Sequence, residues 1–179
     1  MEEEIEPYSI NFLYWQLVGP AALPASVVEE VSRALVEASE PLIVTGYSGR
    51  NHAAVKSLES LANTVKGLRV LDTGGSDMCF PADYLGWLGM KYGVDESLKT
   101  ANVLLILDCD VPWVNKFCKP KASSKIYHFN VDPLKQLMLV FYIDAQQRYR
   151  VDAETAITQI VSYLKSFLLE KLASKEMDR

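Results

Sequence analysis

The sequence has few histidines, few cysteines and no cluster of positive charge. Its 179 residues include 2 His and 3 Cys, and 18 Lys and Arg stand against 23 Asp and Glu, which gives a net charge of -5. Binding to nucleic acid needs clustered Lys and Arg, so this balance excludes that partner. The three cysteines, Cys79, Cys109 and Cys118, are odd in number and lack metal-ligand spacing. They predict reduced thiols in a core, with neither a zinc site nor a disulfide framework.

Long apolar runs are also absent. No stretch approaches the roughly 18 apolar residues of a membrane-spanning helix, and the amino end, MEEEIEP, is acidic where a signal peptide is basic. We therefore expect a cytoplasmic chain with no membrane partner. A length of 179 residues with 49% hydrophobic content suffices to bury one good core rather than two, so we expect one domain.

The stretch PLIVTGYSGRN organises the rest of the chain. Leu42, Ile43 and Val44 form a continuous apolar run that stops at Gly46, which is typical of a strand buried on both faces. Apolar residues at helical spacing over 52–65 then predict a helix. The segment 45–51 is therefore a turn at the carboxyl end of a central strand, where α/β folds usually bind ligands.

Strand and helix patterns alternate along the remaining sequence. Ser26, with Glu29 three residues on, predicts the N-cap of a first helix that ends before Pro41. We expect further strands at 68–71, 103–107, 125–129 and 147–151, and helical segments at 96–100, 134–138 and 153–172. Because alternation implies parallel crossovers, the predicted fold is α/β: a doubly wound, mostly parallel sheet of about five or six strands, with helices on both faces.

The expected domain organisation has three parts. Residues 1–24, which carry Tyr8, Phe12, Tyr14 and Trp15, form a linker or surface arm. Residues 25–172 form a single α/β domain, and residues 173–179 form a tail.

Four segments, in this order and at these intervals, resemble a known family: PLIVTGYSGRN, FPADYLGWLG, TANVLLILDCDVPW and KIYHFNVDPLKQ. They are similar to the central domain of thiamine diphosphate-dependent enzymes of the acetolactate synthase type. Within that superfamily the likeness is to thiamine pyrophosphate-requiring, acetolactate synthase-like proteins, whose central domain similarly reads DVPW and VDPLK. The resemblance covers residues 24–164, most of the chain, and implies a Rossmann-like fold.

Enzymes of that family have three α/β domains. The amino-terminal one supplies a glutamate that activates the cofactor, and the carboxyl-terminal one holds the diphosphate and Mg²⁺ through a Gly-Asp-Gly motif followed by an Asn. This sequence contains no Gly-Asp-Gly, and about 24 residues before the first helix are too few for an α/β domain. The resemblance thus implies an excised central domain with no catalytic residue and no cofactor or metal of its own.

For the parent enzyme, the resemblance implies a carboligase or decarboxylase that acts on 2-oxo acid-type substrates with thiamine diphosphate and Mg²⁺. The role expected of this domain is a scaffold or a vestigial nucleotide-binding domain. Its partners would be the flanking catalytic domains of the same polypeptide, in a homodimer or homotetramer. The alternative is a free-standing Rossmann-like nucleotide-binding module. The aromatic residues before position 16 favour the first reading, because a free-standing domain has little reason to carry an aromatic arm.

Some relatives hold FAD or ADP in this domain, which implies a candidate nucleotide site here. The turn after the first strand supplies Gly46, Ser48, Gly49, Arg50 and Asn51, with backbone amides at a helix start that suit an anion. The Asp-x-Asp-Pro turn that meets the ribose or adenine in relatives corresponds to Asn130 and Asp132. These seven residues are the candidate cofactor-binding set, and a purely structural turn is the favoured alternative.

Two departures from the family pattern support that alternative. Asp108 and Asp110 stand where flavin binders place Gly and Arg, and each carboxylate would repel a diphosphate by roughly 1 kcal/mol or more. Asn130 replaces the first acid of the ribose turn. Asp108 and Asp110 also suit a Mg²⁺ ion by residue type, but an Asp at a strand end more often accepts backbone amides of the next turn, which is the interpretation we favour.

Overall fold

A computed structural model describes residues 21–75, 77–134 and 143–177. The aromatic part of the predicted surface arm and nearly all of the predicted helical turn at 134–138 lie outside the described residues. Among the residues described, no helix is both long enough and apolar enough to cross a membrane.

The centre of the fold is a six-stranded sheet in which every neighbouring pair of strands is parallel. The strands are β1 (Pro41–Thr45), β2 (Arg69–Asp72), β3 (Trp87–Met90), β4 (Val103–Leu107), β5 (Lys125–Asn130) and β6 (Gln147–Arg150). Their spatial order is β3-β2-β1-β4-β5-β6, so the sheet grows in both directions from the β1–β4 pair. This order is that of doubly wound Rossmann-type sheets, and it confirms the predicted fold class.

Strands β1 and β4 form the central pair of the sheet. Residue Ile43 of β1 aligns with Val70 of β2 on one side and with Leu105 of β4 on the other. All five residues of β1 and all five of β4 are buried. Burial on both faces explains why these strands read as continuous apolar runs without alternation.

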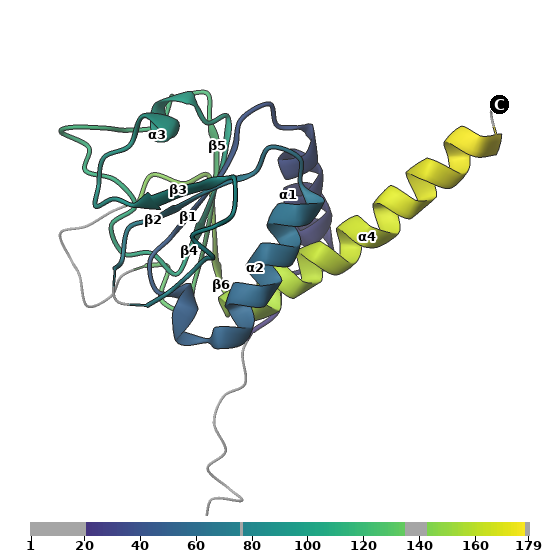
Figure 1. The fold of residues 1–179 in the computed structure, drawn as a ribbon, viewed down its shortest axis with the longest axis horizontal. Helices are drawn as coiled ribbons and strands as arrows, with labels where there is room; N and C mark the ends of the chain where they lie inside the picture. Colours follow the sequence, from purple (N-terminus) through teal and green to yellow (C-terminus); the bar gives the residue numbers. More distant parts are fainter. Residues whose placement is uncertain (1–20, 76, 135–142, 178–179) are drawn as a thin grey trace, which may run out of the picture.

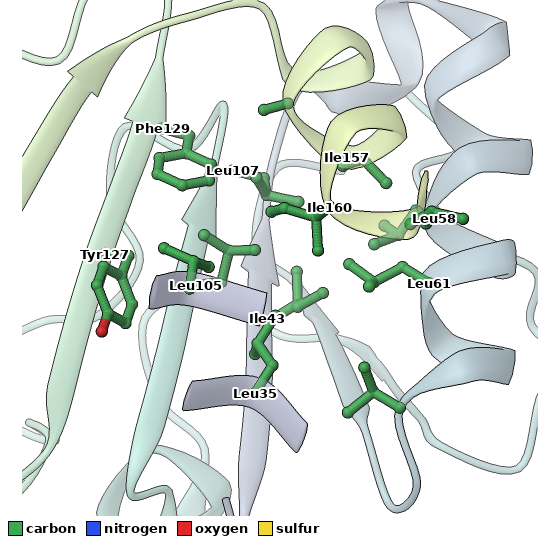
Figure 2. Packing of buried hydrophobic residues seen from close by; sticks show 14 of the residues in the cluster. Leu35, Ile43, Leu58, Leu61, Leu105, Leu107, Tyr127, Phe129, Ile157 and Ile160 are labelled. Carbon is green, nitrogen blue, oxygen red and sulfur yellow. The ribbon is translucent and has the colours of Figure 1, made fainter. Parts of the chain in front are cut away.

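Helices cover both faces unequally (Figure 1). One face carries α1 (Ala25–Glu37), α2 (His52–Thr64) and α4 (Ala153–Met177), with α4 packed on both of the others. The other face carries the short α3 (Glu96–Thr100) and long connections. Figure 2 shows the core on the helical side, where side chains from α2 and α4 meet those of the central strands: Ile43, Leu58, Leu61, Leu105, Leu107, Ile157 and Ile160.

The second core lies between the sheet and the loops of the opposite face. It contains the alternate residues of the central strands, such as Leu104 and Ile106, together with Leu98 of α3 and Trp113. All three cysteines are buried thiols outside any disulfide, and their burial was predicted; two of them, Cys109 and Cys118, belong to this second core.

Strand β3 was not predicted. The segment Trp-Leu-Gly-Met is only partly buried, its Gly89 has φ of 88°, and its pairing with β2 shifts register between Val70 and Asp72. A short, irregular edge strand lacks the apolar run or the alternation by which a strand is found in a sequence.

Two helix ends also differ from prediction. Helix α1 begins at Ala25, so Ser26 lies inside it; the N-cap is Pro24, whose carbonyl accepts the amides of Val27 and Val28. A fixed φ makes proline well suited to a helix start. Helix α4 continues to Met177, past the predicted end at residue 172.

The buried side chains of β4 should contribute strongly to the free energy of unfolding. We expect Leu105→Ala, which deletes a fully buried side chain of β4, to lower the free energy of unfolding by about 2–5 kcal/mol. The control Leu85→Ala removes a side chain that is fully exposed, and it should change that energy by less than about 0.5 kcal/mol. Urea unfolding of both variants measures the difference, and similar losses would show that the core is misplaced.

Candidate functional site at the carboxyl edge of the sheet

The carboxyl ends of all six strands lie along one edge of the sheet because the strands are parallel. At this edge the candidate turn 46–51 follows β1, Asp108 follows β4, and Asn130 ends β5. Strands β1 and β4 are neighbours, and the chain leaves them toward opposite sides of the sheet. In doubly wound folds such a point is where ligands usually bind.

The turn after β1 is built from short internal contacts. Ser48 is buried, and its hydroxyl lies 2.5 Å from that of Thr45. Residues Ser48–Arg50 form a single 3-10 turn, and Asn51 then caps α2, with its side-chain oxygen accepting the Ala53 amide at 3.1 Å. Exposed Arg50 donates to the Tyr47 carbonyl at 3.2 Å. The cap therefore explains Asn51 without a ligand.

Several amides that would face a diphosphate already donate within the protein. The Tyr47 amide donates to the Asp108 carbonyl at 2.8 Å, the Arg50 amide to the Tyr47 carbonyl at 3.1 Å, and the Asn51 amide to the Ser48 carbonyl at 3.2 Å. An anion site at a helix start depends on amides without such partners. This geometry favours the structural interpretation of the turn over nucleotide binding.

The glycines of this edge are explained by close contact between backbone segments. A Cβ atom on Gly74 would overlap the carbonyl of Gly46, and one on Gly49 would overlap the carbonyl of Met78. A Cβ on Gly46 would press on Asp108 and Cys109, at 3.3 and 3.4 Å. The connections after β2 and β4 thus lie directly against the turn.

Asp108 joins three strand ends. It is buried, and its φ of 40° places it in the left-handed region, which is unusual for a residue other than glycine but tolerated by Asp. Its amide donates to Phe129 of β5 at 3.0 Å, and its carbonyl accepts from Tyr47 after β1. Among the described residues, no group of three His, Cys, Asp or Glu side chains could hold a metal ion.

The second part of the predicted nucleotide set lies farther along the edge. Asn130 is buried, and its side-chain oxygen accepts the Asp132 amide at 2.8 Å, so these two residues close their own turn. Strand β4 separates β5 from β1, which puts the two predicted parts about 10 Å apart. The structure brings the turn 46–51 next to Asp108 instead.

A cluster of buried polar groups at the end of β2 was missed by the sequence reasoning. The Thr73 hydroxyl donates to the Thr45 carbonyl at 3.2 Å and lies 3.0 Å from the Cys109 sulfur. The Asp72 carboxylate accepts the Gly74 amide at 2.9 Å. Burial raises the pKa of Asp72, and burial likewise raises the pKa of the Cys79 thiol. An acidic residue at the end of the second strand was the available signal.

Tyr47 carries a related shift on the other side of the turn. Burial raises the pKa of its phenol, and the neighbouring carboxylate of Asp110 raises it further. Asp110 thus faces the turn, as the family comparison of the sequence suggested. A negative charge here disfavours an anionic ligand.

A cavity of about 450 Å³ opens between β3 and the connection that leads to it. Asp72 and Cys79 lie in its wall, and Phe80, Trp87 and Met90 supply apolar surface. Its size falls in the range of small-molecule sites in proteins.

The strand order and the helices on both faces define the chain as a doubly wound α/β domain of Rossmann-like type. Solved structures share this fold, and two of them illustrate the likeness. Benzoylformate decarboxylase from Polynucleobacter necessarius matches with a TM-score of 0.67 at 14% identity, over 90% of this chain and 30% of the enzyme. A protein from Mycobacterium smegmatis assigned as a thiamin diphosphate-dependent enzyme matches with a TM-score of 0.66 at 13% identity, over 82% and 29%.

The chain therefore spans about 30% of the length of the solved chains it matches. No family model matches the sequence, and no curated protein matches it. At these identities the comparison establishes a shared fold, with nearly the whole of this chain corresponding to one portion of each larger chain.

The contact between Gly74 and Gly46 should tolerate no side chain. We expect Gly74→Ala to cost about 3 kcal/mol or more, because backbone would have to move in the centre of the edge. The control Gly67→Asn alters a glycine that has φ of 74° and open space around it, and it should cost less than about 1 kcal/mol. Chemical unfolding compares the two. Equal losses of unfolding free energy in the two variants would mean that the segments after β1 and β2 are not in contact at Gly46 and Gly74.

Proposed function

We propose that this chain is the central, non-catalytic domain of a larger thiamine diphosphate- and Mg²⁺-dependent enzyme of the acetolactate synthase-like type. The observation that carries the proposal is the structural likeness, which takes in 90% of this chain but only 30% of a decarboxylase. The four sequence segments that resemble the central domain of enzymes of the acetolactate synthase type also support the proposal. The domain acts as a scaffold that holds the two catalytic domains of the same polypeptide in place.

The contacts at the carboxyl edge support a scaffold role. Where other doubly wound folds leave room for a nucleotide, the connections after β2 and β4 pack on the turn after β1, and the amides of Tyr47, Arg50 and Asn51 bond to neighbouring carbonyls. The residues Gly46, Ser48 and Asn51 thus serve the fold. The alternative of a free-standing nucleotide-binding module would require these contacts to open.

The cofactor belongs to the flanking domains in this proposal. The sequence contains no Gly-Asp-Gly motif, and the described residues hold no cluster of acidic, His or Cys side chains for Mg²⁺. When bound elsewhere in the parent enzyme, thiamine diphosphate would supply the carbanion chemistry for decarboxylating or joining 2-oxo acid-type substrates. This domain's residues position the flanking domains, and the assembled enzyme is a homodimer or homotetramer.

The test is the activity of the polypeptide encoded by the complete gene. We expect release of CO₂ from a 2-oxo acid that depends on added thiamine diphosphate and Mg²⁺, while the 179-residue chain alone shows none. Pyruvate and benzoylformate are suitable first substrates. A complete polypeptide that binds no thiamine diphosphate would contradict the proposal.

A pair of variants in the complete polypeptide tests the scaffold role. Arg50→Ala alters an exposed residue of the turn, and it should leave kcat within roughly twofold of the original because a scaffold domain lies outside the chemistry. Leu105→Ala should lower the melting temperature while the folded enzyme keeps its kcat at low temperature. A loss of kcat of roughly 100-fold with Arg50→Ala, at unchanged stability, would place this domain in the catalytic machinery.

A further inference from the structure

The scaffold role does not explain the cavity beside β3. The cavity lies between the edge strand β3 and residues 72–75 and 77–82, and its volume is about 450 Å³. The aromatic rings of Phe80 and Trp87 form part of its wall, with their centroids 6.0 Å apart, and Met78 and Met90 add thioether surface. Aromatic and methionine side chains adapt to flat or flexible apolar groups.

The charges in this wall are all negative. Asp72, with only 1% of its surface exposed, and the half-buried Asp77 both line the cavity, and no Lys, Arg or His is among the lining residues. A buried carboxylate is costly unless charged or polar partners surround it. The Asp72 carboxylate accepts the Gly74 amide, and the Gly75 amide and the Cys79 thiol also bond to it. Because a carboxylate has about four acceptor positions, one further donor from a ligand can still bind.

We propose that this cavity binds a small organic cation, with an apolar body against Trp87, Phe80 and the methionines and an ammonium or amidinium group directed to Asp72 and Asp77. A cation gains a charge-assisted hydrogen bond from the carboxylates and an electrostatic attraction to the aromatic rings. A neutral ligand of the same shape gains only the apolar contacts. An anion is repelled by both carboxylates.

The cavity lies on the β2–β3 side of the sheet, and its lining residues include neither Asn130 nor Asp132 nor a residue of the β4–β5 connection. The inference goes beyond the proposed function, and it depends only on the wall of the cavity. If the parent enzyme does not use thiamine diphosphate, the proposal of cation binding is unaffected. If the cavity binds no ligand, the proposed scaffold role is unaffected.

Three ligands of matched shape test the charge preference: 2-phenylethylammonium, 2-phenylethanol and 3-phenylpropionate. The nitrogen–proton NMR signal of the Trp87 indole, assigned with Trp87→Phe, reports binding at the cavity of the 179-residue chain. We expect saturable binding of the ammonium ion, roughly tenfold tighter than that of the alcohol, and no saturation with the carboxylate. Equal affinity for the ammonium ion and the alcohol, tighter binding of the carboxylate, or no saturable binding of the ammonium ion would overturn the proposal.

Charge-neutralising variants locate the cation. Asp72→Asn keeps the shape and the acceptor for the Gly74 amide, and it should weaken binding of 2-phenylethylammonium roughly tenfold while leaving the alcohol unaffected. Asp77→Asn should weaken the ammonium ion at least twofold, and it decides the question if Asp72→Asn does not fold. The control Asp83→Asn removes an exposed acid from the same connection without touching the cavity. Equal losses for Asp77→Asn and Asp83→Asn would also overturn the proposal.

Discussion

The structure depends on the close approach of three backbone segments at the carboxyl edge of the sheet. Gly46, after β1, lies between Gly74, after β2, and the Asp108–Cys109 segment after β4. The hydrogen bond from Tyr47 to the Asp108 carbonyl fixes one of these contacts, and that from Thr73 to the Thr45 carbonyl fixes the other. These contacts lock the strands on both sides of β1, and Asp108 adopts a left-handed conformation to make its part of them.

The same contacts occupy the edge of the sheet where Rossmann-type folds usually bind a nucleotide. The strand order places the β1–β4 pair where a nucleotide diphosphate would bind in related folds. Here the amides of Tyr47, Arg50 and Asn51 donate to backbone carbonyls, and the Asp110 carboxylate lies beside Tyr47. The same fold can occur with or without a nucleotide site, because a binding site occupies only a few loops of a larger framework. The cavity beside β3 is formed by a different loop and has different chemistry.

The sequence was sufficient to predict the parts of the fold that carry a strong local pattern. The apolar runs of β1 and β4 and the periodic apolar residues of α2 and α4 predicted these elements, because burial on a sheet or on one helix face dictates those patterns. Strand β3 was missed because an irregular edge strand buries too little. The N-cap predicted at Ser26 was wrong because α1 has Pro24 as its N-cap and no side chain caps the helix.

The position of the candidate site could be predicted from the sequence, but the contacts made by its residues could not. The turn 46–51 lies at the end of β1 as expected. Its glycines resemble those of a phosphate-binding turn, and only the contacts with residues far along the chain, such as Gly74 and Met78, show that they accommodate backbone.

The most direct measurement is the thermal stability of the 179-residue chain with thiamine diphosphate and Mg²⁺, FAD or ADP at about 100 times a typical Kd, where a bound ligand adds about 2.7 kcal/mol to the free energy of unfolding. The account predicts an unchanged melting temperature with each, and a rise of several degrees with thiamine diphosphate and Mg²⁺ would contradict it.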